Sequence, residues 1–404
     1  MAKLITFGCR LNSCESDVIQ AITDELGVDD YTIINTCAVT AEAERQLRQK
    51  IRQLYREDPN IKIILTGCAA ELSPESYLEI DGIVGIVSNQ TKLLKDSYLK
   101  YANESNKKIT ERPIDKIRGF VQIQNGCDHL CTYCVVHFTR GKSVSFDKDV
   151  IISQIKQSLD RGFKELVLTG VNISSYGQDF SPKSNLAFII RYILQKVPRL
   201  KRLRLSSLDP ADIDDELISL IANEERIMPH IHESIQSGDN MILKRMLRRH
   251  SRETVIETNA KINELRPDVI FGADIITGFP TETDEMFENT HKLLKEGNLS
   301  LLHVFPYSIR KGTPAALMPQ VSKKIAKQRA QLLRKSIDEI LNQKLQKFIG
   351  TTVKVLAESG NEAKTDSFLS VRTSNKMQIG GEYMVKCIEI KDNVIYGEVC
   401  GAIE

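Results

Sequence analysis

The feature that most constrains the fold is a repeated alternation of short apolar segments with amphipathic helical segments. Near the amino terminus, the apolar segments 3–8, 31–36 and 61–67 alternate with helical stretches, of which 41–58 is the clearest. Its acidic residues lie in the first turn and basic residues follow, as the helix dipole favours. Strand–helix–strand alternation indicates a parallel sheet. We therefore predict an open parallel α/β domain for residues 1–90.

A cysteine follows each of these apolar segments, at Cys9, Cys37 and Cys68. Because the carboxyl ends of neighbouring parallel strands share one edge of a sheet, we expect the three thiols to converge there. A single cysteine in such a place is ordinarily a buried core residue. Three at successive strand ends, two of them in Gly-Cys pairs, favour a metal site instead. Cys14 lies past the first turn and is interpreted as a bystander.

A second and longer series of apolar segments begins after residue 115. Its six predicted strands are 119–124, 165–170, 202–207, 230–236, 269–278 and 301–308. Amphipathic helices separate them. Six βα units are too many for a small open sheet and too few for an eight-stranded barrel. The sequence therefore predicts a partial (β/α)6 barrel over residues 115–346, preceded by a polar, proline-containing linker at 91–114.

The last part of the chain, residues 347–404, changes character. Its short strand-like segments are punctuated by Gly, Asn and Asp, which is typical of a small β-barrel. The segment holds seven basic and eight acidic residues, and the whole chain carries a formal charge of +2. This balance neither excludes nor favours nucleic acid, so any RNA surface must be a local patch.

The amino terminus runs straight into a strand-like segment and lacks the apolar region of a signal peptide. The chain also has no stretch of about 18 apolar residues, the length that a membrane-spanning helix needs. We therefore expect a cytoplasmic protein that does not enter a membrane. In such a reducing compartment, clustered cysteines indicate metal binding or catalysis more often than disulfides.

The densest chemical motif follows the first strand of the second series, where Cys127, Cys131 and Cys134 have the spacing CX3CX2C. A structural zinc site would need His129 or His137 as its fourth ligand, and neither has a zinc-finger spacing. Iron–sulfur cubanes are normally held by four thiolates. Three thiolates on such a cluster would leave one iron open for a substrate or cofactor.

This motif resembles the radical S-adenosylmethionine signature, with Tyr133 as the aromatic residue before the last cysteine. Further segments extend the likeness over essentially the whole chain, which resembles the radical S-adenosylmethionine methylthiotransferase family. The segments that carry this likeness are 6–17, 34–53, 65–71, 121–134, 234–250, 272–290 and 303–321. In this family the small β-barrel at the carboxyl end is of the TRAM type.

The resemblance implies two [4Fe–4S] clusters. Cys9, Cys37 and Cys68 would hold an auxiliary cluster, and Cys127, Cys131 and Cys134 would hold the cluster whose open iron binds S-adenosylmethionine. One S-adenosylmethionine would methylate sulfur at the auxiliary cluster, and another would yield the 5′-deoxyadenosyl radical that activates a C–H bond. The resemblance assigns no catalytic residue beyond the cluster cysteines.

The same resemblance implies contacts to S-adenosylmethionine. Tyr133 would lie beside the adenine, and Gly170 and Asn172, in the segment 169–172, would contact the methionine part. The expected partners are tRNA, bound through its anticodon loop, and an electron donor such as flavodoxin or ferredoxin.

Three substrate branches remain open within the family. They act on N6-threonylcarbamoyladenosine at position 37 of tRNA, on N6-isopentenyladenosine in tRNA, or on an aspartate of a ribosomal protein. The segments around the first three cysteines most resemble the threonylcarbamoyl branch, since the isopentenyl branch typically carries Gln-Met-Asn where this chain has Arg10, Leu11 and Asn12. The alternative of another class is a non-catalytic RNA-binding protein with structural zinc.

Two further groups of residues have open interpretations. The basic run 243–253, with Arg248 and Arg249, is either a solvated helix face or a set of phosphate contacts. His230, His232 and His303 lie in predicted strands and are interpreted as core or cavity-lining residues rather than metal ligands.

Overall fold

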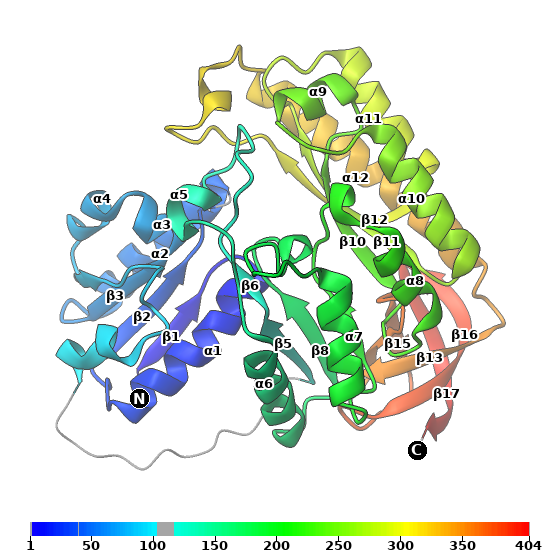
Figure 1. The fold of residues 1–404 in the computed structure, drawn as a ribbon, viewed down its shortest axis with the longest axis horizontal. Coiled ribbons are helices and arrows are strands. Elements are labelled where there is room, and N and C mark those ends of the chain that lie inside the picture. The colour runs from blue at the N-terminus through cyan, green and yellow to red at the C-terminus, as the bar shows by residue number, and fades with distance from the viewer. Residues whose placement is uncertain (1, 39, 103–116, 404) are drawn as a thin grey trace.

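The computed structural model describes residues 2–38, 40–102 and 117–403, which form three units (Figure 1). An N-terminal α/β unit lies beside a central barrel of strands and helices, and a small β-barrel at the carboxyl end packs below it. This arrangement confirms the predicted fold class. Among the described helices, none is both long and apolar enough to span a membrane.

The N-terminal unit is built on a four-stranded sheet in which every pairing is parallel. Its strands, in spatial as well as chain order, are β1 (Lys3–Thr6), β2 (Tyr31–Thr36), β3 (Lys62–Gly67) and β4 (Ile83–Ile86). The three strands predicted from the sequence are all present. β4 was not predicted, because four residues with one exposed valine make a weak pattern.

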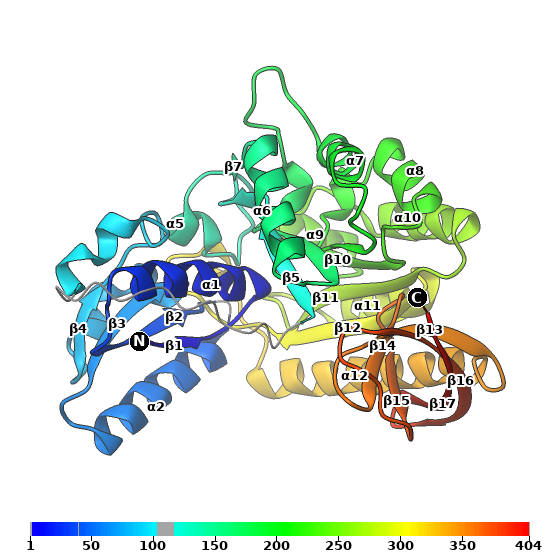
Figure 2. The same ribbon diagram turned by 90° about the horizontal axis from the view of Figure 1, so that it is seen from below.

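Helices cover both faces of this sheet (Figure 2). On one face, α1 (Arg10–Glu25) places Ile19 in a core with Ile33 and Ile64, and on the other, α2 (Ala41–Glu57) packs Leu47, Ile51 and Leu54. The strands are therefore buried on both sides and read as continuous apolar runs. The short helices α3 (Cys68–Leu72) and α4 (Pro74–Leu78) follow β3.

The segment predicted as a linker, 91–114, is described as far as residue 102. This part packs onto the N-terminal unit: η1 (Lys95–Tyr101) buries Tyr98 and Tyr101 in the core beside α1. Lys92 is fully buried and binds Glu15. The other positions of the predicted linker, 103–114, lie outside the described residues, and the domain bounds stay a prediction.

The central barrel has the six predicted parallel strands, arranged as two sheets of order β5-β8-β9 and β10-β11-β12. Two parallel bridges, Leu203 to Ile227 and Leu208 to Glu233, join the sheets. The strands are β5 (Arg118–Gln122), β8 (Glu165–Thr169), β9 (Leu203–Leu205), β10 (His230–Gln236), β11 (Ile270–Thr277) and β12 (Leu299–Pro306), with a small ribbon of β6 (Gln124–Asn125) and β7 (Val144–Ser145). In the described chain the barrel is open between β5 and β12, and α1 contacts β5 there.

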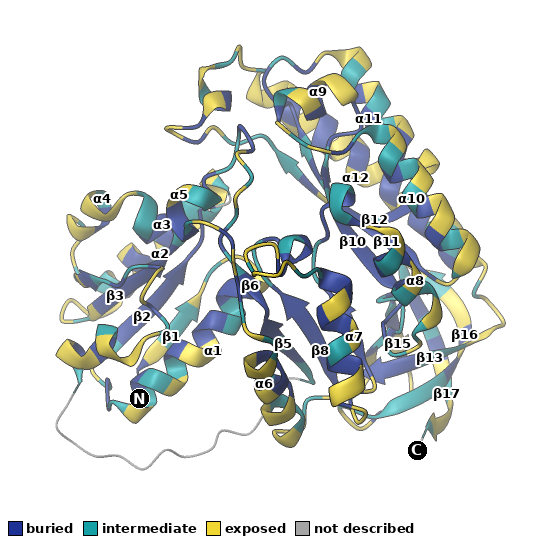
Figure 3. Cartoon of the chain, viewed as in Figure 1, coloured by how far each residue is buried: buried dark blue, intermediate teal, exposed yellow. Residues whose placement is uncertain are grey.

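Amphipathic helices cover the outside of the barrel, and their apolar faces are buried against the strands (Figure 3). They are α6 (Lys148–Asp160), α7 (Leu186–Lys196), α8 (Asp215–Asn223), α10 (Arg252–Leu265), α11 (Asp284–Glu296) and the long α12 (Lys323–Gln346). Asp, Asn, Ser and Thr side chains cap the N-termini of these six helices, as N-cap preferences predict.

The C-terminal unit is a closed five-stranded barrel of order β13-β14-β15-β17-β16. Its strands are β13 (Thr352–Ala357), β14 (Glu362–Thr365), β15 (Ser370–Thr373), β16 (Glu382–Lys391) and β17 (Val394–Ile403). Leu341 and Leu345 of α12 and Ile270 of β11 complete its core, so the small barrel is packed directly onto the central one.

A buried ion cluster also joins these two barrels. Glu165 of β8 is fully buried and binds Arg118, Arg202 and Arg204, and Arg202 reaches Asp366 of the C-terminal unit. Burial raises the pKa of Glu165, but Arg204, Arg118 and Arg202 outweigh it and lower that pKa to about 2. Glu165 is therefore ionised, and its negative charge compensates the positive charges of the three arginines.

We predict that Glu165→Gln destabilises the chain by about 3–5 kcal/mol, because it leaves buried guanidinium groups uncompensated. Thermal unfolding of the variant should show a midpoint well below that of the parent chain. The matched control is Glu216→Gln. It removes an ion pair between Glu216 and Arg191, and both of these side chains are exposed. The control should change stability by about 0.5 kcal/mol or less. Equal effects of the two substitutions would contradict the structural role of Glu165.

Candidate functional site

The first three candidate cysteines lie at one edge of the N-terminal sheet, as predicted. Cys9 is the residue before α1, Cys37 directly follows β2, and Cys68 begins α3 directly after β3. Cys37 is buried, Cys68 is half-buried and Cys9 is exposed. Three thiols from three neighbouring strand ends thus share the edge at which open α/β sheets bind ligands.

The two Gly-Cys pairs have a steric reason. Gly8 and Gly67 both have φ of +95°, a region that L side chains rarely adopt. A Cβ on Gly8 would lie 2.4 Å from Cys37 Cβ and 2.5 Å from Cys37 Sγ. A Cβ on Gly67 would lie 2.3 Å from the carbonyl oxygen of Thr36. The glycines therefore let the strand ends approach closely enough to gather the cysteines.

Cys14 is set apart from this trio. Its thiol donates a hydrogen bond to the carbonyl oxygen of Phe120 at 3.5 Å, which ties α1 to β5. Burial raises the pKa of Cys14 to about 12, with Asp17 and Glu15 adding to the effect. This contact turns the Cys14 thiol toward β5, and the geometry supports the bystander interpretation.

The second trio lies on the loop that follows β5 and β6. Backbone amides donate to two of its sulfurs, from His129 to Cys127 and from Val136 to Cys134, both at 3.4 Å. Arg248 Nη1 lies 3.6 Å from Cys131 Sγ. Hydrogen bonds of this kind stabilise thiolates and tune iron–sulfur clusters. The donor set around the trio therefore fits a cluster.

The residues expected to contact S-adenosylmethionine lie near this loop. Tyr133 makes an edge-to-face contact with Phe279, with ring centroids 6.5 Å apart. Gly170 follows β8, where a Cβ would lie 2.8 Å from the Gln124 carbonyl oxygen. The side-chain nitrogen of Asn172 is buried and has no hydrogen-bond partner. An unpartnered buried amide of this kind fits a bound cofactor.

The loop carrying the second trio docks onto the N-terminal unit. Val135, next to Cys134, is buried in the N-terminal core with Ala69 and Ala70 of α3. The helix that follows, α5 (Val136–Arg140), lies beside α3 (Figure 1). Asn89 donates from Nδ2 to the carbonyl oxygen of Thr139 at 2.8 Å. The two cysteine trios are thereby brought to one boundary between the units.

Arg140, at the end of α5, forms the centre of that boundary. Its guanidinium donates to Cys68 Sγ at 3.3 Å, to Asn12 Oδ1 at 2.7 Å and to Glu15 Oε1 at 2.7 Å. Lys92 Nζ donates to the other oxygen of Glu15 at 2.5 Å. Burial lowers the pKa of Arg140, but Cys68 and Glu15 outweigh it, so the pKa is raised.

The two trios also lie within electrostatic reach of each other. Burial raises the pKa of Cys134 to about 12, and the negative charges of Cys131, Cys127 and Cys68 add to the shift. Bringing these thiolates together therefore costs free energy, which a bound metal would offset.

The Arg140–Glu15–Lys92 network was not predicted from the sequence. A signal for Glu15 exists, because Leu11, Glu15 and Ile19 lie at helical spacing on the buried face of α1. A charge on an otherwise apolar stripe indicates a buried partner. No comparable signal marks Arg140 or Lys92, which meet Glu15 from distant parts of the chain.

The histidines proposed as fourth zinc ligands have other neighbours. His129 Nδ1 faces Asp209 Oδ2 at 3.5 Å, and the His137 ring lies against Phe138. Asp209 also binds Arg248 at 3.1 Å. Burial raises the pKa of Asp209, but His250 and Arg248 outweigh it and lower that pKa. These contacts favour an open site over a zinc knuckle.

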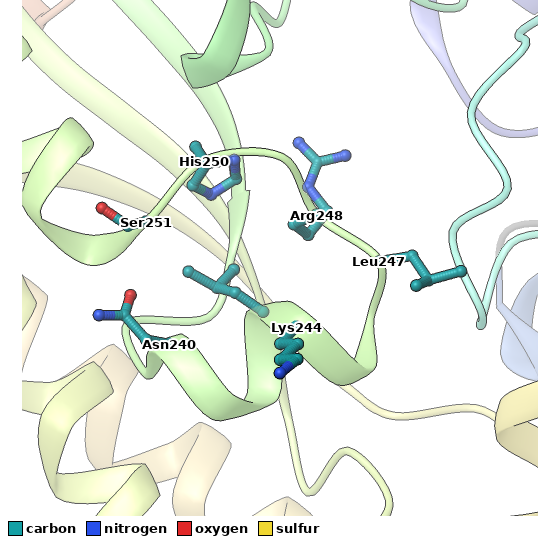
Figure 4. A pocket seen from close by; sticks show the side chains of 7 residues that line it. Asn240, Lys244, Leu247, Arg248, His250 and Ser251 are labelled. Atoms are coloured by element: carbon teal, nitrogen blue, oxygen red, sulfur yellow. The ribbon is translucent and has the colours of Figure 1, made fainter.

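The basic run 243–253 is neither a uniformly solvated helix face nor a continuous set of residues free to contact phosphate. Arg248 is largely buried between Asp209 and Cys131, so it is not available to phosphate. Arg249 pairs with Asp212 near the surface. The run also borders a surface hollow at the turn from α9 (Asn240–Arg245) to α10 (Figure 4). The hollow is lined by Asn240, Leu243, Lys244, Leu247, Arg248, His250 and Ser251.

The three histidines predicted to lie in strands, His230, His232 and His303, are on β10 and β12 of the barrel. His232 Nε2 and His303 Nδ1 each lie 3.1 Å from Asp274 Oδ1, on three adjacent strands. His230 stacks on Phe368 of the C-terminal unit with ring centroids 5.2 Å apart. Of the described residues, His232, Asp274 and His303 form a group that could hold a metal ion, although the histidine–carboxylate contacts already account for their positions.

Comparison with known proteins places both parts of this site in recognised families. Residues 121–294 match the radical SAM superfamily, and residues 2–88 match a family described as uncharacterized protein family UPF0004. The fold resembles a radical S-adenosylmethionine methyltransferase, TsrM, from Kitasatospora setae, with a TM-score of 0.54 and 13% identity over 76% of this chain and 70% of that one. At this identity the likeness concerns the fold alone.

Closer relatives match over nearly the full length. The chain is 46% identical to the threonylcarbamoyladenosine tRNA methylthiotransferase MtaB of Rickettsia prowazekii, over 96% of this chain and 95% of the relative. It is 32% identical to the MtaB protein of Bacillus subtilis, over 96% and 92%. It is also 33% identical to the tRNA-2-methylthio-N(6)-dimethylallyladenosine synthase of Protochlamydia amoebophila, over 94% and 90%.

The fold and the two cysteine trios define a radical S-adenosylmethionine protein with an additional N-terminal cysteine site. The chain belongs to the radical S-adenosylmethionine methylthiotransferase family. Membership implies a [4Fe–4S] cluster and S-adenosylmethionine as cofactors.

We predict that Gly8→Ala destabilises the chain more than Gly162→Ala does. Both glycines have similar positive φ, +95° and +96°, but a Cβ on Gly162 meets nothing within 4 Å. The control should therefore cost only the conformational penalty of about 1–2 kcal/mol. Gly8→Ala adds the overlap with Cys37. Thermal unfolding of both cluster-free variants measures the difference, and equal midpoints would contradict the close approach.

Proposed function

We propose that this protein transfers a methylthio group to C2 of N6-threonylcarbamoyladenosine at position 37 of tRNA. The observation that carries the proposal is the 46% identity over nearly the full length to a protein named for this activity. The arrangement of the two cysteine trios at one boundary supports it, because the reaction must activate a C–H bond and deliver sulfur at the same carbon.

In this proposal each trio holds a [4Fe–4S] cluster. Cys127, Cys131 and Cys134 bind one cluster with an iron open to S-adenosylmethionine, and the trio of Cys9, Cys37 and Cys68 binds the second. When bound, these groups supply radical C–H activation and the methylthio group. Amide donors at 3.4 Å to Cys127 and Cys134, and Arg140 at 3.3 Å from Cys68, support thiolate ligation.

Four further residues lie where they can position the cofactor or add charge near its cluster. Tyr133, packed on Phe279, presents a ring face beside which an adenine can lie. Asn172 offers its unpartnered side-chain amide to the polar end of S-adenosylmethionine. Gly170 lets the end of β8 lie close to Gln124, since any Cβ there would lie 2.8 Å from the Gln124 carbonyl oxygen. Arg248 would hold positive charge next to Cys131.

The partners follow from the reaction. The anticodon loop of tRNA must reach the boundary between the N-terminal unit and the barrel, where the cysteines gather. Reduction of the radical cluster requires an electron donor, and we propose a flavodoxin or ferredoxin. Cys9 is exposed, so part of this boundary is accessible.

The main alternative keeps the reaction and changes the nucleoside. Relatives named for dimethylallyladenosine match at 32–33% identity, also over nearly the full chain. The higher identity to the threonylcarbamoyladenosine relative favours our proposal. The ribosomal-protein branch and a zinc-binding RNA protein have no observation in their favour.

We predict that the anaerobically reconstituted chain binds about eight iron atoms, two clusters of four. Replacing Cys9, Cys37 and Cys68 together by Ala should reduce this to about four, because the second trio is untouched. Cys400→Ala, which removes an exposed cysteine of the C-terminal unit, is the control and should leave iron unchanged. Iron analysis and the visible absorption spectrum give the readout. A triple variant that keeps all its iron would overturn the two-cluster assignment.

Deletion of the gene should abolish the 2-methylthio form of threonylcarbamoyladenosine in tRNA and leave the 2-methylthio isopentenyl form intact. Mass spectrometry of nucleosides from total tRNA measures both in one sample, so each serves as a control for the other. Restoring the gene should restore the lost nucleoside. Persistence of the threonylcarbamoyl form together with loss of the isopentenyl form would show that the substrate assignment is wrong.

A further inference from the structure

The inside of the barrel carries charge where most βα barrels carry branched apolar side chains. Along β8, Leu166 and Leu168 pack outward into the helical core, so the alternating residue Glu165 faces inward. By the same alternation, Arg204 of β9 faces inward, since Leu203 and Leu205 are in the helical core, and His230 of β10 faces inward, since Ile231 is in that core. The lumen therefore carries polar and charged side chains at the start of these strands.

An aromatic ring from the C-terminal unit is the point on which these cations converge. Phe368 lies between β14 and β15 with a φ of +71°. The charged groups of Arg118, Arg204 and Lys364 lie 5.0, 4.8 and 5.0 Å from its ring centroid. The guanidinium carbon of Arg10 lies 5.9 Å from the same centroid. Four cations around one ring repel one another unless anions compensate them.

The acidic groups nearby are already engaged. Glu165 binds Arg118, Arg202 and Arg204, and Asp274 binds His232 and His303. Glu358 pairs with Arg118. Even so, Arg118 Nη2 and Arg204 Nη1 are buried without a hydrogen-bond partner. Buried guanidinium donors without a partner leave hydrogen bonds that an anionic acceptor could take.

The pKa values of Lys364 and His230 respond to these cations. Burial lowers the pKa of Lys364, and Arg118 and Arg204 lower it further against the opposing effect of Glu358. Burial also lowers the pKa of His230, together with Arg204, His232, Arg10 and His303. Arg10, although it belongs to the N-terminal unit, thus acts on the lumen of the barrel.

Arg10 is the accessible member of this group. Its side chain is exposed, and its guanidinium lies over the Phe368 ring. Partial burial and Arg118 lower the pKa of Arg10, against the opposing effect of Asp274 and Glu165. It directly follows Cys9, so its position is fixed relative to the N-terminal trio. Arg118, Arg202 and Arg204 are instead held by Glu165.

We propose that Arg10, supported by the cations around Phe368, binds the carboxylate of the threonylcarbamoyl group and so selects the substrate. The inference rests on the function proposed above. In the adenine ring, C2 and the carbon bearing the N6 substituent flank the same nitrogen, N1. A group that holds the substituent must therefore lie next to the site that delivers sulfur to C2. Arg10 meets this requirement, because it directly follows Cys9 of the N-terminal trio, which we propose delivers the sulfur.

A cationic subsite also explains rejection of the alternative nucleoside. An isopentenyl substituent is neutral and apolar, and it would leave the guanidinium groups unpaired while losing their hydration. A threonylcarbamoyl substituent brings one carboxylate that accepts hydrogen bonds from Arg10. Arginine is suited to this task because its planar guanidinium binds a carboxylate through two parallel hydrogen bonds.

The test compares binding of two RNA probes to full-length, cluster-loaded protein without reductant, so that no turnover occurs. Both are anticodon stem-loops, one bearing threonylcarbamoyladenosine and the other its carboxyl methyl ester, which lacks the charge and adds one methyl group. The parent protein should prefer the acid over the ester by on the order of 10- to 100-fold. Arg10→Gln should bring this ratio close to one, and Arg10→Lys should retain part of it.

The matched control is Arg45→Gln, which removes an exposed arginine of α2 paired with Glu42 and should leave the preference unchanged. Iron content near that of the parent would show that Arg10→Gln retains its fold and clusters. If it does not, the Arg10→Lys ratio decides instead. A full preference in Arg10→Gln, while the parent protein still modifies threonylcarbamoyladenosine, would overturn the subsite alone. A parent protein that modifies only isopentenyladenosine would overturn the proposed function itself.

Discussion

The arrangement of this molecule depends on one buried contact, between Arg140 of the barrel and Glu15 of the N-terminal unit. Arg140 comes six residues after Cys134 and donates to Glu15, Asn12 and Cys68 across the boundary. A buried ion pair of this kind adds little net stability, because desolvation offsets much of its attraction. It does specify geometry: only a docked N-terminal unit satisfies the charge of Arg140, and that docking brings the two cysteine trios together.

The rest of the site follows from this docking. The sheet edge supplies three thiols and the barrel loop supplies three more, and neither unit alone holds both. Because Arg10 follows Cys9 on the same docked helix, docking also carries a cation to the lumen of the barrel, where Phe368 arrives from the C-terminal unit. Glu165 acts in the same manner at the boundary between the central barrel and the C-terminal unit, where it binds Arg118, Arg202 and Arg204. Two buried carboxylates thus join three units around a single space.

The strands and the positions of the cysteines could be predicted from the sequence, because their signals lie in residues that are neighbours along the chain. Each of the six barrel strands coincides with a short apolar run of the sequence. Cys9, Cys37 and Cys68 each directly follow such a run in the N-terminal unit, so they were expected at one sheet edge. The contacts between units were not predictable in that way. Arg140 meets Glu15 across 125 positions of sequence, and Lys92 lies in a segment whose polar composition indicated a linker. Arg248 was read as part of a surface charge run, yet tertiary packing places it between Asp209 and Cys131.

The central claim is that two clusters lie at one boundary and face one substrate. Electron paramagnetic resonance of the fully reduced, cluster-loaded protein tests it most directly, because two paramagnetic clusters at short range broaden each other's signals. The reference spectra come from two variants, each lacking one cysteine trio. We predict that the spectrum of the parent protein differs from the sum of these two references through spin–spin interaction. A parent spectrum equal to that sum would contradict the account.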